Sequence, residues 1–86
     1  MRTIKQEICG ANIIELTISH NGYRGGDSGH GGFVEISIKD LAGTDMMING
    51  KEVNEFTLRV QGDSERTTFL DAFKVIVNEL ENNRKV

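Results

Sequence analysis

The sequence predicts an α+β domain, in which a four-to-five-stranded antiparallel sheet forms a meander and one C-terminal helix packs on one face. Three segments in the first two thirds of the chain alternate apolar and polar residues, which is typical of strands buried on one side. In the last third the apolar spacing changes to three and four, which is typical of a helix with one apolar stripe. With 86 residues and no linker or internal repeat, we expect a single domain, residues 1–86.

The period-two pattern is clearest over residues 14–20, 34–39 and 56–60. A fainter version over residues 4–8 predicts a first strand ahead of these three. The Gly-Ala-Asn segment at residues 10–12 then fits a short hairpin connection between the first two strands.

A further hairpin is predicted at Asn49-Gly50, because both residues of its tight turn must accept positive φ. This dipeptide separates residues 46–48 from residues 51–53. We therefore expect a short extra ladder that leads into the strand at residues 56–60.

The helix is expected to begin where Asp63 or Ser64 supplies an N-cap, with Glu65 in the first turn, where the helix dipole favours negative charge. Arg84 and Lys85 are expected at its far end, where cations are favoured. The apolar stripe that should cover the sheet consists of Phe69, Leu70, Phe73, Ile76, Val77 and Leu80.

The predicted sheet has an apolar face under the helix and a polar face of mixed charge. A single helix covers four strands only partly, so we expect a homo-oligomer formed through a strand edge or the open face. The polar face is expected to carry Glu15, Thr17, Ser19, Glu35, Ser37, Lys39, Thr57 and Arg59.

Composition excludes several classes of protein. With 10 basic and 13 acidic residues, the net charge of −3 argues against a nucleic-acid binder. No apolar run approaches the roughly 20 residues that a membrane span needs, and the N-terminus lacks the apolar core of a signal peptide. The single cysteine, Cys9, excludes an intrachain disulfide and a multi-cysteine zinc site. We expect a buried, inert Cys9 thiol and a reducing, cytoplasmic setting.

Functional residues are expected in a glycine-rich segment that joins two strands. Six of the ten glycines lie within residues 22–32, and about twelve residues replace the two to five of an ordinary hairpin loop. Such a loop is either a floppy surface segment or a loop ordered by a ligand or a neighbouring subunit. Its residue types favour a ligand slightly.

The side chains of this loop suit an anionic small ligand. An aromatic ring can stack on a planar group, a guanidinium can form a fork with phosphate or carboxylate, and glycine amides can converge on an anion. Hydroxyl, carboxylate and imidazole groups can hydrogen-bond a ribose or a base edge. The candidate ligand-binding residues are Tyr23, Arg24, Gly25, Gly26, Asp27, Ser28 and His30.

Familiar phosphate and protease motifs fail here. The loop lacks the Gly-Lys-Ser/Thr ending of a P-loop, and it leads into a strand, unlike a dinucleotide-binding fingerprint. Residues 26–29, Gly-Asp-Ser-Gly, resemble the tetrapeptide around the nucleophile of trypsin-like serine proteases. The chain is too short for the two barrels of that family. The same Gly-Asp-Ser tripeptide recurs at residues 62–64, where it starts the helix.

Metal binding and catalysis are weaker interpretations. His20, Asp27 and His30 could ligate a metal, but no fourth ligand is apparent and the spacing is loose. His20 equally fits a half-buried residue at the sheet end. A nucleophile pair of Ser28 with either histidine has no orienting partner except Asp27. We predict no catalytic residue, metal site or cofactor.

The sequence therefore leaves three functional hypotheses. The first is a non-enzymatic protein that captures a small anionic ligand, with a nucleotide or nucleotide-derived signal as first choice. The second is an interaction module or inhibitor that docks on a partner protein through its sheet edge or open face. The third is a small hydrolase that uses the His, Asp and Ser residues of the loop. In general character the chain resembles small phage-encoded counter-defence proteins, some of which sequester nucleotide signals.

Overall fold

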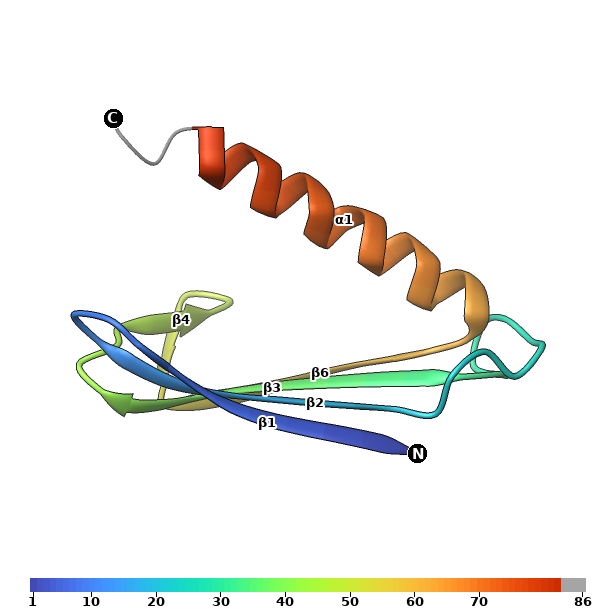
Figure 1. The fold of residues 1–86 in the computed structure, drawn as a ribbon, viewed down its shortest axis with the longest axis horizontal. Helices are drawn as coiled ribbons and strands as arrows, with labels where there is room; N and C mark the ends of the chain where they lie inside the picture. Colours follow the sequence, from blue (N-terminus) through green and yellow to red (C-terminus); the bar gives the residue numbers. More distant parts are fainter. Residues whose placement is uncertain (83–86) are drawn as a thin grey trace.

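The computed structural model describes residues 1–82 and has one sheet, one separate hairpin and one helix (Figure 1). The predicted α+β class is confirmed, and the predicted cations Arg84 and Lys85 lie outside the described residues. The elements are β1 (Arg2–Cys9), β2 (Ile13–His20), β3 (Phe33–Ala42), β4 (Met46–Ile48), β5 (Lys51–Val53), β6 (Glu55–Gln61) and α1 (Asp63–Asn82).

The main sheet is an antiparallel meander with the strand order β1-β2-β3-β6. Its register aligns apolar residues into rows across the strands, since Ile18 lies opposite both Ile4 and Ile36, and Ile36 lies opposite Leu58. Because side chains alternate between the two faces of a strand, these rows form one apolar face. The alternation read from the sequence therefore predicted the sheet correctly.

Both predicted tight connections are present. Residues 10–12 join β1 to β2, and β4 pairs with β5 across Asn49 and Gly50. Asn49 has φ of 54° and Gly50 has φ of 78°, the pair of positive values that this two-residue turn requires.

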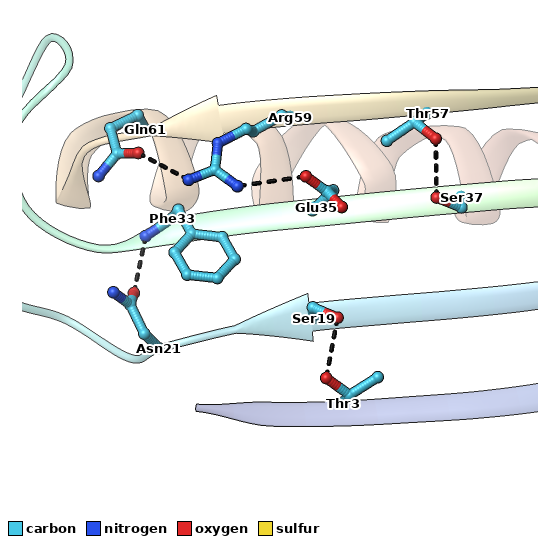
Figure 2. Close-up of polar contacts among 9 residues, drawn as sticks. All are labelled: Thr3, Ser19, Asn21, Phe33, Glu35, Ser37, Thr57, Arg59 and Gln61. Carbon is cyan, nitrogen blue, oxygen red and sulfur yellow. Dashed lines mark hydrogen bonds and ion pairs between the residues drawn. The ribbon is translucent and has the colours of Figure 1, made fainter.

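The opposite face of the sheet is polar and points away from the helix (Figure 2). Ser37 and Thr57 hydrogen-bond across β3 and β6 at 2.8 Å between their hydroxyl oxygens. Arg59 donates to the Glu35 carboxylate at 3.2 Å, and its guanidinium lies 4.2 Å from the centre of the Phe33 ring. The predicted polar face is therefore tied together by cross-strand pairs.

The helix lies over the apolar face but diverges from it along its length (Figure 1). It contacts β6 and β3. Phe73 is half-buried, whereas Ile76 is 51% exposed and Leu80 is 66% exposed. Val77 is 59% exposed as well, so the expectation that Ile76, Val77 and Leu80 would cover the sheet is wrong. The helix starts directly after β6 and rises away from the sheet, so only its first half is near the strands.

The apolar surface is consequently covered only in part. Among the described residues no apolar side chain is fully buried. The accessible surface of 6433 Å² exceeds the roughly 5,000 Å² expected of a folded monomer of this mass. The radius of gyration of 14.6 Å likewise exceeds the about 12 Å expected for a compact domain of this length. The single chain therefore leaves apolar surface that a bound molecule or a second chain could cover.

Cys9 is exposed, and the prediction of a buried thiol is wrong. Its odd position in β1 puts it on the same side as Lys5 and Glu7, away from the apolar face, and β1 is an edge strand. The thiol donates to the Glu7 carboxylate at 3.3 Å, and this hydrogen bond raises the pKa of Cys9. The thiolate, which is the reactive form, is thereby disfavoured.

Within residues 1–82, no helix combines the length and the apolar character needed to cross a membrane.

Candidate functional site

The glycine-rich loop lies against the start of α1, where the chain leaves β6 (Figure 1). Three backbone hydrogen bonds fix this junction: Gly62 donates to the Gly32 carbonyl at 2.6 Å, and Asp63 donates to the Gly26 carbonyl at 2.7 Å. Gly29 donates to the Gln61 carbonyl at 3.0 Å. The loop therefore continues the sheet and meets the first turn of the helix.

The Asp63 carboxylate organises the loop. It accepts hydrogen bonds from the backbone amides of Arg24 at 3.0 Å, Gly25 at 2.7 Å and Gly32 at 3.0 Å. The amide hydrogen bonds from Gly32 and Arg24 hold the pKa of Asp63 below its ordinary value. The converging amides that the sequence suggested for an anionic ligand therefore already bind an anion of the protein itself.

Asp27, in the loop, in turn binds a backbone amide at the start of the helix. Its carboxylate accepts the backbone amide of Ser64 at 2.8 Å, one of the free amides of the helix start. Hydrogen bonds from Ser64 hold the pKa of Asp27 below its ordinary value. The predicted N-cap was Asp63 or Ser64, but the Asp63 side chain is engaged by the loop and the capping carboxylate comes from Asp27. Glu65 accepts the Ser28 amide at 3.1 Å.

Two glycines are required for this geometry. Gly31 has φ of 96°, and a Cβ there would collide with the Gly26 carbonyl. A Cβ at Gly32 would collide with the Gly22 carbonyl. The glycines at these positions therefore permit close backbone approach. The loop is held by carboxylates of its own chain. The sequence had suggested instead either a floppy segment or a loop ordered by a ligand or a neighbouring subunit.

The remaining candidate side chains occupy different surroundings. The Tyr23 hydroxyl lies 3.2 Å from the Thr67 hydroxyl, and the Arg24 Nε donates to the Asn21 carbonyl at 2.9 Å. His30 is exposed, and its amide donates to the Asp27 carbonyl at 3.1 Å. The structure thus brings the loop and the helix start together, but it directs these three side chains to separate places.

A contact between Arg66 and His20 that sequence reasoning missed lies beneath this junction. The Arg66 guanidinium lies 4.5 Å from the centre of the Tyr23 ring, a cation–π distance. One of its terminal nitrogens, Nη1, lies 3.5 Å from Nδ1 of His20, which is half-buried. A signal was present in the sequence, because Arg66 precedes Phe69 by three residues and so shares the apolar stripe of the helix.

Arg66 and His20 stand at the end of a cavity between α1 and the sheet, which we call the apolar groove. Its volume is about 180 Å³, and it is partly open to solvent. Both side chains lie at the end nearest the loop, because His20 ends β2 and Arg66 is in the first turn of the helix. The groove is lined by Ile18, His20, Val34, Ile36, Leu58, Val60, Arg66, Phe69, Leu70 and Phe73.

The side chains considered for a metal or hydrolytic site make other contacts in the structure, His20 with Arg66 and Asp27 with Ser64. No group of three or more His, Cys, Asp and Glu residues in the part of the chain that the structure describes could hold a metal ion. Within residues 1–82 the structure gives no hydrogen bond between the Ser28 hydroxyl and either histidine, and the Asp27 carboxylate is bound to Ser64. The Asp27 carboxylate is therefore occupied as a helix cap.

No protein-family model, curated protein or solved structure matches the chain. The geometry of the groove and the loop therefore carries the functional argument.

Proposed function

We propose that the protein is a non-enzymatic binding protein that captures a small ligand with an apolar, planar body and an anionic group. The proposal rests on one observation: the apolar groove has eight apolar lining residues, and its one cationic side chain, Arg66, lies with the polar His20 ring at the same end. Pockets that bind small molecules combine apolar walls with a few convergent polar groups.

The two phenylalanine rings of the groove suit an aromatic ligand body. The Phe69 and Phe73 rings are 6.2 Å apart and tilted by 60°, so they offer apolar surface in two orientations. Sites for drug-sized ligands measure about 300–1,000 Å³, so a cavity of about 180 Å³ holds the body of a small ligand and leaves the rest outside. A nucleotide base with its phosphate directed at Arg66 meets both conditions.

Arg66 is better prepared than Arg24 to bind an anion. The Tyr23 ring and His20 hold the Arg66 guanidinium from two sides, which reduces the entropy lost when it binds. Arg24 is exposed on the loop and does not line the groove. The protein would act by sequestering its ligand, as do some of the phage-encoded counter-defence proteins that it resembles in general character.

The test begins with a thermal-shift screen against mono-, di- and cyclic nucleotides, because a ligand that binds only the folded state raises the melting temperature. The ligand found is then titrated by calorimetry into the parent protein, Arg66→Ala and Arg24→Ala. A lost charge-assisted hydrogen bond is worth about 1.5–3 kcal/mol, so Arg66→Ala should weaken binding by about tenfold or more. Arg24→Ala should bind as the parent does.

Two other outcomes would contradict ligand binding in the apolar groove. Unchanged affinity in Arg66→Ala removes the groove cation from the site. Loss of affinity in Arg24→Ala alone restores the glycine-rich loop as the binding site, as the sequence suggested.

A protein-interaction module is the second candidate, favoured by the exposed apolar side chains of Ile76, Val77 and Leu80 beyond the groove. Charge complementarity with Arg66 selects an apolar peptide that ends in a carboxylate as its partner. Titration with such a peptide, and with the same peptide amidated, separates the candidates. If the protein binds the free-acid peptide but binds no nucleotide, the protein-interaction module is the correct function.

A further inference from the structure

We propose that two copies of the chain pair through β1, antiparallel and centred on Gln6, to form one eight-stranded sheet. This inference uses a surface apart from the apolar groove and does not depend on the ligand proposed for it. It rests on an open strand edge, on the charge pattern of that strand and on the apolar row that runs into it.

β1 is an open edge. All eight of its residues are exposed, and within residues 1–82 it pairs only with β2. Natural proteins protect such edges with proline, charged side chains (lysine above all), inward-pointing charges or a covering segment. The chain has no proline, and the charged side chains Lys5 and Glu7 both lie on the polar face of the sheet.

The other edge strand, β6, is less open. The Gln61 carbonyl at its end already accepts the amide of Gly29 from the glycine-rich loop. Its cation Arg59 is paired with Glu35 at 3.2 Å within the chain. The more open of the two edges is therefore β1.

The sequence of β1 is self-complementary in one register. When Gln6 lies opposite Gln6 of the second copy, Lys5 lies opposite its Glu7 and Ile4 lies opposite its Ile8, and two-fold symmetry repeats both pairs. Shifting one copy by two residues places Lys5 opposite Lys5, or Glu7 opposite Glu7. Shifting it by one residue turns apolar side chains to the polar face. Charge and burial thus select the same register.

The neighbouring strand adds a reason for this charge pairing. Glu7 lies directly opposite Glu15 in the β1–β2 register, a like-charge pair that destabilises a sheet. Lys5 reaches Glu15 only at 3.9 Å, in an exposed contact. Lys5 of a second copy would lie beside Glu7 on its free side and offset the repulsion between the two glutamates.

The apolar face continues through the same pairing. Ile4 is 41% exposed and Ile8 is 43% exposed in the single chain. In the paired sheet Ile4 lies between Ile18 of its own chain and Ile8 of the second copy, which lengthens the apolar row already formed with Ile36. The accessible surface of 6433 Å², above the roughly 5,000 Å² of a compact monomer, is consistent with a chain completed by a partner.

Light scattering coupled to size exclusion measures the mass of the full chain and of charge variants over a micromolar concentration series. The parent should form a species of twice the 9.5 kDa chain mass. Lys5→Glu and Glu7→Lys each replace two attractive pairs with two repulsive ones, so each should raise the dimer dissociation constant about tenfold. The double variant restores the pairs in reversed order and should return within about threefold of the parent.

Lys51→Glu, in the separate β4–β5 hairpin, is the matched control for a change of net charge and should leave the mass unchanged. A monomeric parent overturns the proposal, and so does a dimer that tolerates both single reversals. Single reversals that the double variant does not rescue overturn the register. Ligand titration of the same variants keeps the two proposals separate, since weakened dimers with intact ligand affinity leave the groove unaffected.

Discussion

The backbone amide of Gly25 donates to the Asp63 carboxylate at 2.7 Å, across 38 positions of the chain. The Asp27 carboxylate, two residues further along the same loop, accepts the amide of Ser64 at 2.8 Å. Loop and helix thus each supply the anion that the other's amides need. This exchange holds the loop against the start of the helix, and it sets Tyr23 beside Arg66 at the mouth of the apolar groove.

Removing the charge of Asp63 should loosen the loop. Asp63→Asn keeps the shape of the side chain but weakens the acceptor shared by the amides of Arg24, Gly25 and Gly32. Hydrogen exchange of these three amides should become at least about tenfold faster. Asp71→Asn, on the exposed side of the same helix, is the control and should leave those rates unchanged.

Acid should act on the same junction. The pKa values of Asp27 and Asp63 are lowered in the folded state, whereas in the unfolded chain an aspartate has a pKa of about 3.9. Carboxylates with depressed pKa values add stability that is complete above the unfolded value and is lost as the pH falls through the folded value. The melting temperature should therefore stay level above about pH 5 and decline as the pH drops below about 4.

The Asp27→Asn/Asp63→Asn variant checks the source of that decline. It lacks both titrating groups, so its melting temperature should fall less steeply with acid than that of the parent. If both proteins lose the same number of degrees over this range, the decline arises at other carboxylates.

Phe73 should contribute less stability than a fully buried phenylalanine. Complete truncation of a buried Phe costs about 3–5 kcal/mol, and Phe73 is only half-buried in the single chain, so Phe73→Ala should cost roughly half of that. Val75, 68% exposed on the same helix, is the matched control, and Val75→Ala should stay within about 0.5 kcal/mol. Equal urea midpoints for the two variants would contradict the packing of the first half of the helix on the sheet.

Tyr23 should act as a positioning residue for Arg66. Its ring lies under the guanidinium, whereas its hydroxyl contacts Thr67, so ring and hydroxyl can be tested apart. Tyr23→Ala should weaken ligand binding, and Tyr23→Phe, which keeps the ring, should restore most of the affinity. Calorimetry with the ligand identified in the screen measures both variants. Weakening by Tyr23→Phe as strong as that by Tyr23→Ala would assign the effect to the hydroxyl.

The fold was predictable because its signals are local. Alternation along each strand and the Asn49-Gly50 turn lie within a few residues of each other, and these features correctly predicted the sheet and the extra hairpin. The course of the helix was not predictable. An apolar stripe indicates which side of a helix avoids water, but the angle at which the chain leaves Gly62 decides how far along the stripe contact persists. Ile76 and Leu80 lie beyond that point.

The candidate site was harder to predict because its contacts join distant residues. Asp63 meets its three amide donors across 31, 38 and 39 positions, and nothing in the glycine-rich segment itself indicates that a helix carboxylate reaches it. The composition of the loop did predict an anion among its amides. It could not show that the anion belongs to the protein, nor that Arg66 would join Tyr23 and His20.

The most direct test of the ligand site is an amide chemical-shift map of the isotope-labelled protein, recorded as the ligand from the screen is titrated in. If the ligand binds in the groove, the largest changes should fall on lining residues from three elements, Val34, Val60 and Phe73, together with the side-chain Nε signal of Arg66. Changes confined to residues 22–32, with these groove signals unmoved, would contradict it and return the site to the glycine-rich loop.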